Sequence, residues 1–178
     1  MPFAESEVDD AIKYWFGDNY QVSTKGKKWW FTKPGKEQET KDKEIKEKYG
    51  DLLLRVEQRK GAITNAKEGL MMILFLDQFS RHIYREDTPD NKEKKAFNDN
   101  MALIISEKMV ELNWDLILSP MCRPFVLMPF RHTFQKKYIQ IAINQTHLYL
   151  NSQEHPAWKK FLQVSQKKMI ELSISEEC

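Results

Sequence analysis

An apolar run at residues 69–76 limits the folds available to this chain more than any other feature. Every position from Leu70 to Leu76 is apolar, so a helix formed there must be surrounded by protein on all sides. Polar residues follow at once, and at 100° per residue Asp77 and Arg81 continue the same helical stripe as Leu70. Charged groups on a buried stripe need partners or a cavity. This segment is therefore predicted to carry both core packing and a candidate site.

The rest of the chain predicts helices and no sheet. Apolar residues recur at steps of three and four, and no stretch alternates with a period of two between hairpin turns. Helices are expected at about residues 6–16, 37–60, 65–84, 91–112, 133–150 and 154–175. The predicted fold class is all-α, with six or so helices in a bundle or a helix-pair stack. A length of 178 residues suits a single domain.

Local signals place the helix ends and faces. Ser6 is expected to begin the first helix and Gly17 to end it in the left-handed helical conformation, while Asn65 and Glu68 have the spacing of a capping box before the central helix. In the helix at 91–112 the positions that share one side are Phe97, Met101, Ile104, Ile105, Lys108 and Leu112, and Ala102 and Met109 widen that side. We expect that side to face the core.

Residues 113–134 differ from the other segments because they contain three prolines. Ser119-Pro120 is typical of a helix start, and Pro129 is expected to close the short helix that follows. An apolar segment interrupted in this way is predicted to pack inside the protein. Its polar members Arg123 and His132 are therefore candidate site residues.

Charge and cysteine content exclude several functional classes. The net charge of +2 is a small difference between 28 basic and 26 acidic residues, which argues against a nucleic-acid binder. The stretch 25–36 surrounds three consecutive aromatic residues with lysines, and the favoured interpretation is that Trp29 and Phe31 anchor a loop to the core; binding of single strands is the alternative. Two cysteines without a disulfide framework, no signal sequence and no apolar run of about 20 residues favour a cytoplasmic protein that does not enter a membrane.

Four segments resemble, in order, the landmarks of the family known as domain of unknown function 924. They are Trp15-Phe16, Trp29-Trp30-Phe31, the run from Leu76 to Arg85, and the run from Arg123 to His132. The resemblance covers about residues 8–140 and implies a helical fold similar to tetratricopeptide helix-pair stacks; it implies no activity. The chain departs from the family in having Ser80 where proline is usual, His82 where asparagine is usual, and Phe134 in place of an acid. A Gly-Arg-Phe-Pro-His-Arg-Asn stretch of the family has no counterpart, so the helix at 154–175 is expected to be divergent.

The positions carried over from this resemblance form one candidate ligand site: Asp77, Gln78, Arg81, Tyr84, Arg85, Arg123 and His132. Asp77 and Arg81 have the spacing of a helical ion pair, and removing Arg81 from a fully buried pair would cost about 3–5 kcal/mol. One interpretation is a network that only locks the proline-rich segment to the central helix. Another is a pocket for a small anionic ligand or for the acidic end of a peptide or protein partner, because arginine recognises carboxylate and phosphate.

Enzymatic chemistry is the least favoured alternative. It would use Asp77 and His132 as an acid–base pair of a small-molecule enzyme, and no catalytic residue is assigned. No nucleophile elbow, phosphate loop or zincin motif is present, and His82, His147 and His155 lack the spacing of metal ligands. We therefore expect no metal and no cofactor.

Overall fold

The structure is all-helical, as the periodicity predicts. The computed structural model describes residues 2–177, without the side chains of residues 31, 176 and 177, and contains no strand in that range. The α-helices are α1 (Glu5–Phe16), α2 (Lys36–Gln58), α3 (Ala66–Ile73), α4 (Ser80–Ile83), α5 (Pro89–Glu111), α6 (Arg123–His132), α7 (Lys136–Ser152) and α8 (Pro156–Glu177). Two short 3₁₀ turns, η1 (Lys28–Phe31) and η3 (Asp115–Ile117), and a π-helical segment, η2 (Leu74–Phe79), complete the order.

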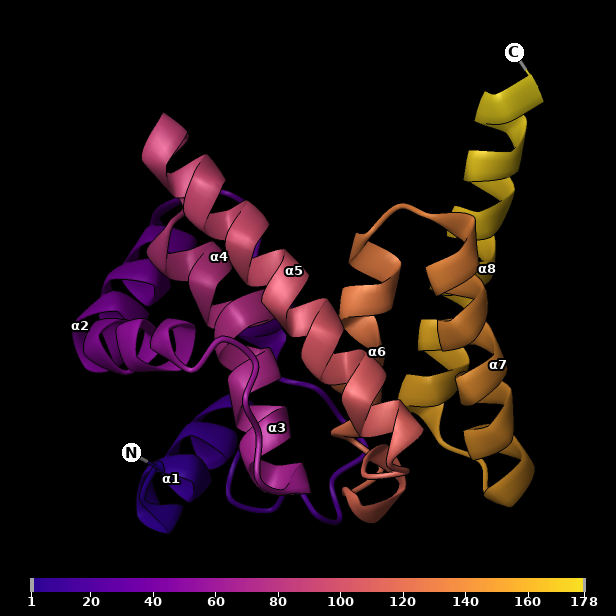
Figure 1. The fold of residues 1–178 in the computed structure, drawn as a ribbon, viewed down its shortest axis with the longest axis horizontal. Helices are drawn as coiled ribbons and strands as arrows, with labels where there is room; N and C mark the ends of the chain where they lie inside the picture. Colours follow the sequence, from indigo (N-terminus) through magenta and orange to yellow (C-terminus); the bar gives the residue numbers. More distant parts are fainter. Residues whose placement is uncertain (1, 178) are drawn as a thin grey trace.

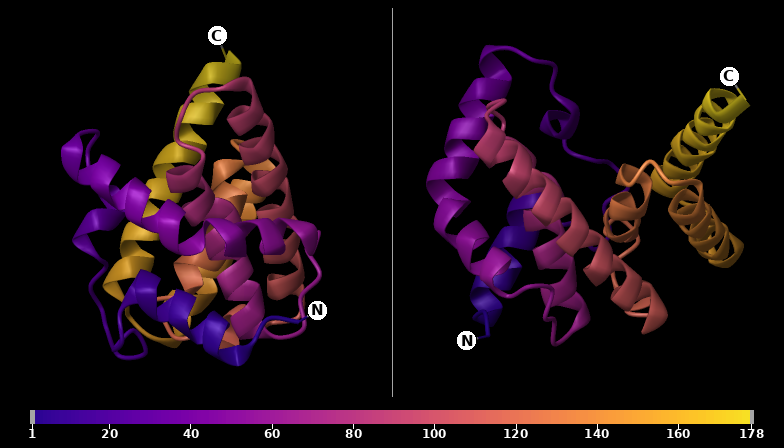
Figure 2. Two further views of the ribbon diagram at one scale, coloured as in Figure 1. Left: turned by 90° about the vertical axis from the view of Figure 1, so that its left-hand side faces the viewer. Right: turned by 45° about the horizontal axis from the view of Figure 1, so that its top comes forward.

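Helix α5 separates two groups of helices. Figure 1 shows α1 to α4 on one side of α5 and α6 to α8 on the other, with α7 and α8 side by side and the end of α8 extending beyond α7. The connection between α1 and α2 reaches from the start of α2 to the α6 side of the molecule (Figure 2). Trp30 in this connection packs against Phe125 of α6, with ring centroids 4.9 Å apart. The connection therefore joins the two groups.

The central helix is continuous from α3 through η2 to α4. Every residue from Leu70 to Leu76 is at most 1% exposed, which confirms that this run is surrounded by protein. Asn65 begins the helix by accepting a hydrogen bond from the backbone of Glu68. The Glu68 carboxylate turns to Thr64 instead of Asn65, so only one half of the predicted capping box forms.

The predicted starts and ends of two helices, α1 and α6, are corrected. Helix α1 begins at Glu5, with the Glu7 carboxylate accepting a hydrogen bond from the backbone of Ala4, so Ser6 lies inside the first turn. Gly17 ends α1 with φ 93° and ψ 164°, which is not the left-handed helical conformation. Helix α6 does not start at Ser119 and does not stop at Pro129; it starts at Arg123 and contains Pro129. All residues from Pro124 to Phe130 are buried, so packing compensates for the backbone hydrogen bond that proline removes.

The buried side of α5 is shifted from the predicted one, because the predicted Ala102, Ile105 and Met109 are buried but other predicted members are exposed. Phe97, Ile104 and Leu112 are each more than 40% exposed, whereas the buried residues are Asn98, Ala102, Ile105, Ser106 and Met109. Asn98 is fully buried because its side-chain amide donates to Oε1 of Glu57 on α2 at 2.8 Å. A polar residue with such a partner belongs to the core, and an apolar pattern alone cannot identify it.

The aromatic stretch before α2 packs as the anchoring interpretation predicts. The ring centroids of Trp29 and Trp15 are 4.9 Å apart, and Trp30 stacks on Trp15 at 5.9 Å. The indole nitrogen of Trp30 also donates to the backbone oxygen of Trp15. The side chain of Phe31, expected to act as a second anchor, lies outside the described residues. Within residues 2–177 every helix is too short or too polar to cross a lipid bilayer.

Candidate functional site

The π-helical segment places Asp77 at the centre of the molecule. A π turn is uncommon and changes the register of the backbone hydrogen bonds, and here the backbone of Ser80 donates to the carbonyl of Phe75, five residues earlier. The carbonyls of Leu76 and Asp77 accept hydrogen bonds from the side chains of Ser80 and Arg81. Ser80 and Arg81 belong to the polar half of the central helix, so side chains from this half stabilise the π turn by binding its carbonyls.

Asp77 is fully buried and binds His132 of α6. The Nδ1 atom of His132 lies 2.6 Å from Oδ1 of Asp77, and Nη2 of Arg81 donates to the same oxygen at 3.3 Å. Gln78 donates to Oδ2 of Asp77 at 2.6 Å and to the sulfur of Met128 at 3.4 Å. Both carboxylate oxygens therefore have donors, which is the condition for burying a charge.

The charge on Asp77 fixes the orientation of His132. Burial would raise the pKa of the Asp77 carboxyl, but the neighbouring His132 and Arg81 and the hydrogen bond from Gln78 hold this pKa below its ordinary value. An ionised carboxylate only accepts hydrogen bonds, so Nδ1 of His132 must carry the proton that it shares with Asp77. The opposite edge of the ring, which carries Nε2, then remains available outside this pair.

Asp99 of α5 is a member of this cluster that the sequence did not indicate. Its Oδ1 atom accepts a hydrogen bond from Nη2 of Arg81 at 2.9 Å. Burial raises the pKa of the Asp99 carboxyl, with Arg81 acting in the opposite direction. Arg81 thus bridges two carboxylates from two helices. Only the position of α5 relative to α4 reveals this contact, because Asp99 lies 18 residues from Arg81 and has no distinctive neighbours.

The structure brings together four of the seven predicted site residues and places the other three elsewhere. Asp77, Gln78, Arg81 and His132 form the cluster just described. Tyr84 donates to Glu57 of α2 at 2.9 Å, and Arg85 pairs with Asp42 of α2, beside His82. Arg123, expected to meet the central helix, instead donates to the backbone oxygens of Leu118 and Leu116.

A pocket opens beside His132, between the end of α6 and the middle of α8. We call it the His132 pocket; it is lined by Arg131, His132, Phe134, Val164, Lys167, Lys168 and Glu171 and has a volume of about 320 Å³. Three of these side chains are permanent cations, Arg131, Lys167 and Lys168, and one, Glu171, is a carboxylate. Lys168 lies 3.6 Å from that carboxylate, Glu171, and 4.5 Å from the Phe134 ring centroid. The pocket is therefore suited to an anion.

Arg131 is a pocket residue that the sequence reasoning missed. It directly precedes His132 and is partly buried, and its guanidinium stacks over the ring of Phe161 of α8 at 4.6 Å. Among the described residues no carboxylate lies within ion-pair distance of it. Burial lowers the pKa of the Arg131 guanidinium, against the attraction of Asp77. A sequence signal was available, since Arg131 precedes the predicted His132 in the same short proline-rich helix.

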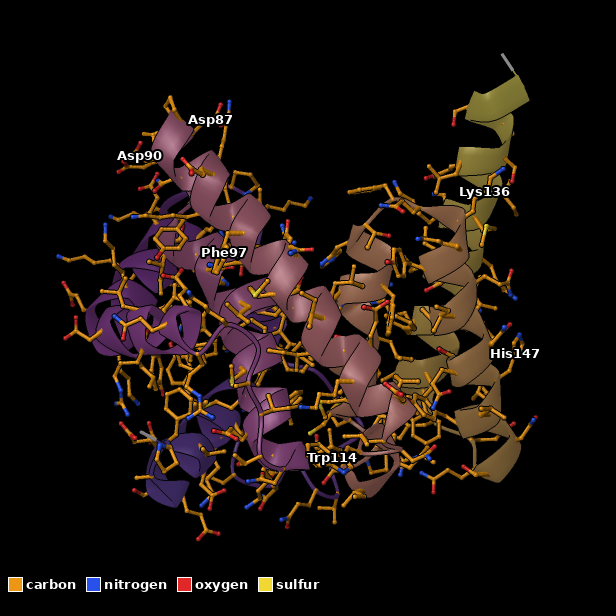
Figure 3. All side chains as sticks on the ribbon, viewed as in Figure 1. Asp87, Asp90, Phe97, Trp114, Lys136 and His147 are labelled. Atoms are coloured by element: carbon orange, nitrogen blue, oxygen red, sulfur yellow. The ribbon has the colours of Figure 1, made fainter. Side chains whose placement is uncertain are left out.

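The described residues contain no group of three or more histidine, cysteine, aspartate or glutamate side chains placed to hold a metal ion. His147 lies on the outward side of α7, away from the other helices (Figure 3). His155, at the start of α8, is buried, and its Nδ1 accepts a hydrogen bond from the backbone of Ala157. These two histidines therefore do not join His132.

Comparison with known proteins extends the family resemblance. The sequence model of the family described as a bacterial protein of unknown function, DUF924, matches residues 11–172, further than the 8–140 expected from the motifs. The solved structure of a protein of unknown function from Agrobacterium tumefaciens is similar with a TM-score of 0.68 at 19% identity, over 92% of this chain and 81% of that one. No curated protein matches the chain.

Proposed function

The chain belongs to the family described as a bacterial protein of unknown function, and from the geometry of its site we propose that it binds a small anionic ligand in the His132 pocket. The observation that carries the proposal is the Asp77–His132 pair. Asp77 is buried and binds Nδ1 of His132, so the other edge of the ring is left for a pocket that also contains Arg131 and Lys167.

The charges around the pocket support an anion rather than a cation. Asp77 and Asp99 both accept hydrogen bonds from Arg81, whereas Arg131 stacks on Phe161 and pairs with none of the described carboxylates. A guanidinium that is partly removed from water without an anionic partner is costly. A bound carboxylate or phosphate would supply two acceptors in the fork geometry that arginine prefers.

Titration with inorganic phosphate and with acetate at fixed ionic strength tests the proposal. A ligand at 100 times its Kd stabilises the native state by about 2.7 kcal/mol, which is a Tm rise of roughly 5–10 °C for a chain of this size. We expect Arg131→Gln and His132→Gln to lose this rise and Lys108→Gln, an exposed cation on α5, to keep it. Equal responses of the native protein and both pocket variants would overturn the proposal.

A second candidate function is proton transfer to or from a bound anion. The same pair favours it, because a buried aspartate that binds Nδ1 fixes the orientation and the tautomer of the ring, as a general base requires. Incubation of each anion in D₂O followed by mass spectrometry would detect conversion as exchange of a carbon-bound hydrogen for deuterium. Conversion that disappears in His132→Gln would support an enzyme; binding without conversion would leave only the ligand-binding function.

The anionic ligand of the His132 pocket could also be the acidic end of a peptide that binds to a stack of helix pairs. Support comes from the side-by-side packing of α7 and α8 and from the part of α8 that extends beyond α7 (Figure 1). An acidic peptide would then compete with phosphate for the pocket. Failure to compete would restrict the ligand to small molecules.

A further inference from the structure

An apolar pocket adjoins the His132 pocket, and the two share Arg131 and Val164 in their walls. It has a volume of about 370 Å³. Its walls come from the connection between α1 and α2 that contains η1, from residues 121–131 in and just before α6, and from residues 156–164 of α8. These walls are mostly apolar. The main contributors are Trp30, Met121, Phe125, Met128, Phe161 and Val164.

The aromatic wall of this pocket is fixed in place by the core. Trp30 stacks on Trp15 and meets Phe125 edge-on, and its indole N–H is bonded to the backbone of Trp15. Gly26 also lines the pocket, and a Cβ at that position would lie 2.5 Å from the Trp30 ring. The absence of a side chain at Gly26 therefore lets the ring lie against the backbone. A preformed apolar surface of this kind needs little rearrangement to accept a ligand.

Arg131 stands where the apolar pocket meets the His132 pocket. Stacking on Phe161, which lines the apolar pocket, holds the guanidinium at the boundary. Among the described residues, the other polar side chains in the wall of the apolar pocket belong to Thr24 and Lys160, and none in the wall is acidic. One molecule could therefore place an anionic group at the cationic His132 pocket and an apolar group in the apolar pocket.

We propose that the ligand is a small carboxylate with an apolar tail, its carboxylate bound by Arg131 at the edge of the His132 pocket and its tail in the apolar pocket. The proposal rests on the proposed anion-binding function and adds the class of ligand. A volume of about 370 Å³ lies near the lower end of small-molecule pockets, which suits a medium-length acyl chain or one aromatic ring rather than a long lipid. Burying the tail would cover apolar surface that the free protein leaves exposed to water.

Calorimetric titration of the whole chain with butanoate, hexanoate and octanoate tests the proposal. Each added methylene that enters an apolar pocket is expected to raise affinity about fourfold, so octanoate should bind well over tenfold more tightly than butanoate. Octylammonium, with the same tail and the opposite charge, should not bind. Equal binding of octylammonium would overturn the assignment of the head group to Arg131.

Methyl NMR of the native protein provides a readout that needs no variant. Met121 and Met128 line the apolar pocket, whereas Met71 and Met72 are fully buried in the core. Octanoate should shift the methyl signals of Met121 and Met128 and leave those of Met71 and Met72 unchanged. Phosphate, which has no tail, should shift Met121 little. Octanoate binding without a shift at Met121 and Met128 would place the tail elsewhere and overturn the proposal.

Filling the apolar pocket separates this inference from the proposed function. Ala157 of α8 lines the pocket, and Ala157→Phe should abolish the gain with chain length while phosphate still binds. Ala96→Phe, at an exposed position of α5, is the matched control and should keep the gain. If the native protein binds phosphate but its affinity for the carboxylates does not depend on their chain length, the inference of an apolar tail is overturned and the proposed anion-binding function stands. Loss of Arg131-dependent binding for all anions would overturn both.

Discussion

The Nδ1 atom of His132 lies 2.6 Å from Oδ1 of Asp77, a carboxylate with no exposed surface, and this bond joins two helices across 55 residues of sequence. The bond gives the central helix a chemical partner in α6 as well as a packing partner. Because Asp77 also accepts bonds from Arg81 and Gln78, it has more than one stabilising contact. Because Asp77 keeps other donors when one is removed, the loss of stability expected for Arg81→Ala is moderate.

Arg81→Ala is expected to lower the free energy of unfolding by about 1–3 kcal/mol, because one donor to a buried carboxylate is lost while two remain. This is less than the 3–5 kcal/mol expected for a fully buried pair, since the Arg81 side chain is 38% exposed. Urea unfolding measures the change. Arg55→Ala, which removes a more exposed pair with Glu7, is the control and should cost below about 1 kcal/mol. Equal losses in the two variants would contradict the structural importance of Asp77.

Arg123→Lys should destabilise the protein without changing anion binding. Arg123 donates from two different nitrogens to the carbonyls of Leu118 and Leu116 and lies over the rings of Tyr149 and Trp158. A lysine cannot reproduce the planar fork or the stacking, so we expect a loss of about 1–2 kcal/mol in urea unfolding. A phosphate affinity reduced tenfold in this variant would instead return Arg123 to the binding site.

His82 should make stability fall as the pH is lowered below about 6.5. Burial lowers the pKa of His82 below its ordinary value, although its hydrogen bond to Asp42 acts in the opposite direction. The folded protein then takes up this proton at a lower pH than the unfolded chain does. The contribution of His82 is therefore complete above the unfolded pKa and is lost as the pH falls towards the folded pKa.

His82→Asn tests this prediction, because it removes the titrating group and keeps a donor for Asp42. We expect a smaller fall in Tm than in the native protein between pH 7 and pH 5, with the difference disappearing above pH 7. His147→Asn changes an exposed histidine and should leave the native profile intact. A His82→Asn profile parallel to the native one would show that another group causes the loss.

Ser80→Pro should cost less than proline in a regular helix. In the π turn the backbone of Ser80 bonds to Phe75 rather than to Leu76, so the usual clash of proline with the carbonyl four residues earlier is relieved. The family resemblance also has proline at this position. Proline removes both the N–H that donates to Phe75 and the hydroxyl that donates to Leu76, so we expect a loss of about 2 kcal/mol, against about 3 kcal/mol or more for Glu47→Pro at an exposed interior position of α2. Equal losses in urea unfolding would argue that residue 80 is in an ordinary α-helix.

Helix positions and the buried central run followed from local sequence. A helix of period 3.6 and the residues that punctuate it are encoded within a few residues of each other, so α2, α5, α7 and α8 were predicted to within a few residues. The run from Leu70 to Leu76 has no polar face that could be exposed to water, and it is buried. Pro129 was misjudged because burial on all sides, which is not a local property, keeps α6 intact around it.

The site was predictable only in part, because its members lie on different helices. The sequence determined that Asp77 and Arg81 share a face, since four residues make about one helical turn, and it marked His132 by the proline-rich segment around it. Only the tertiary structure decided that Asp99 and Arg131 join them, that Arg123 turns to its own loop, and that α8 closes two pockets beside Arg131. Those outcomes depend on how helices approach one another through packing and buried hydrogen bonds, and no spacing within a single helix specifies that approach.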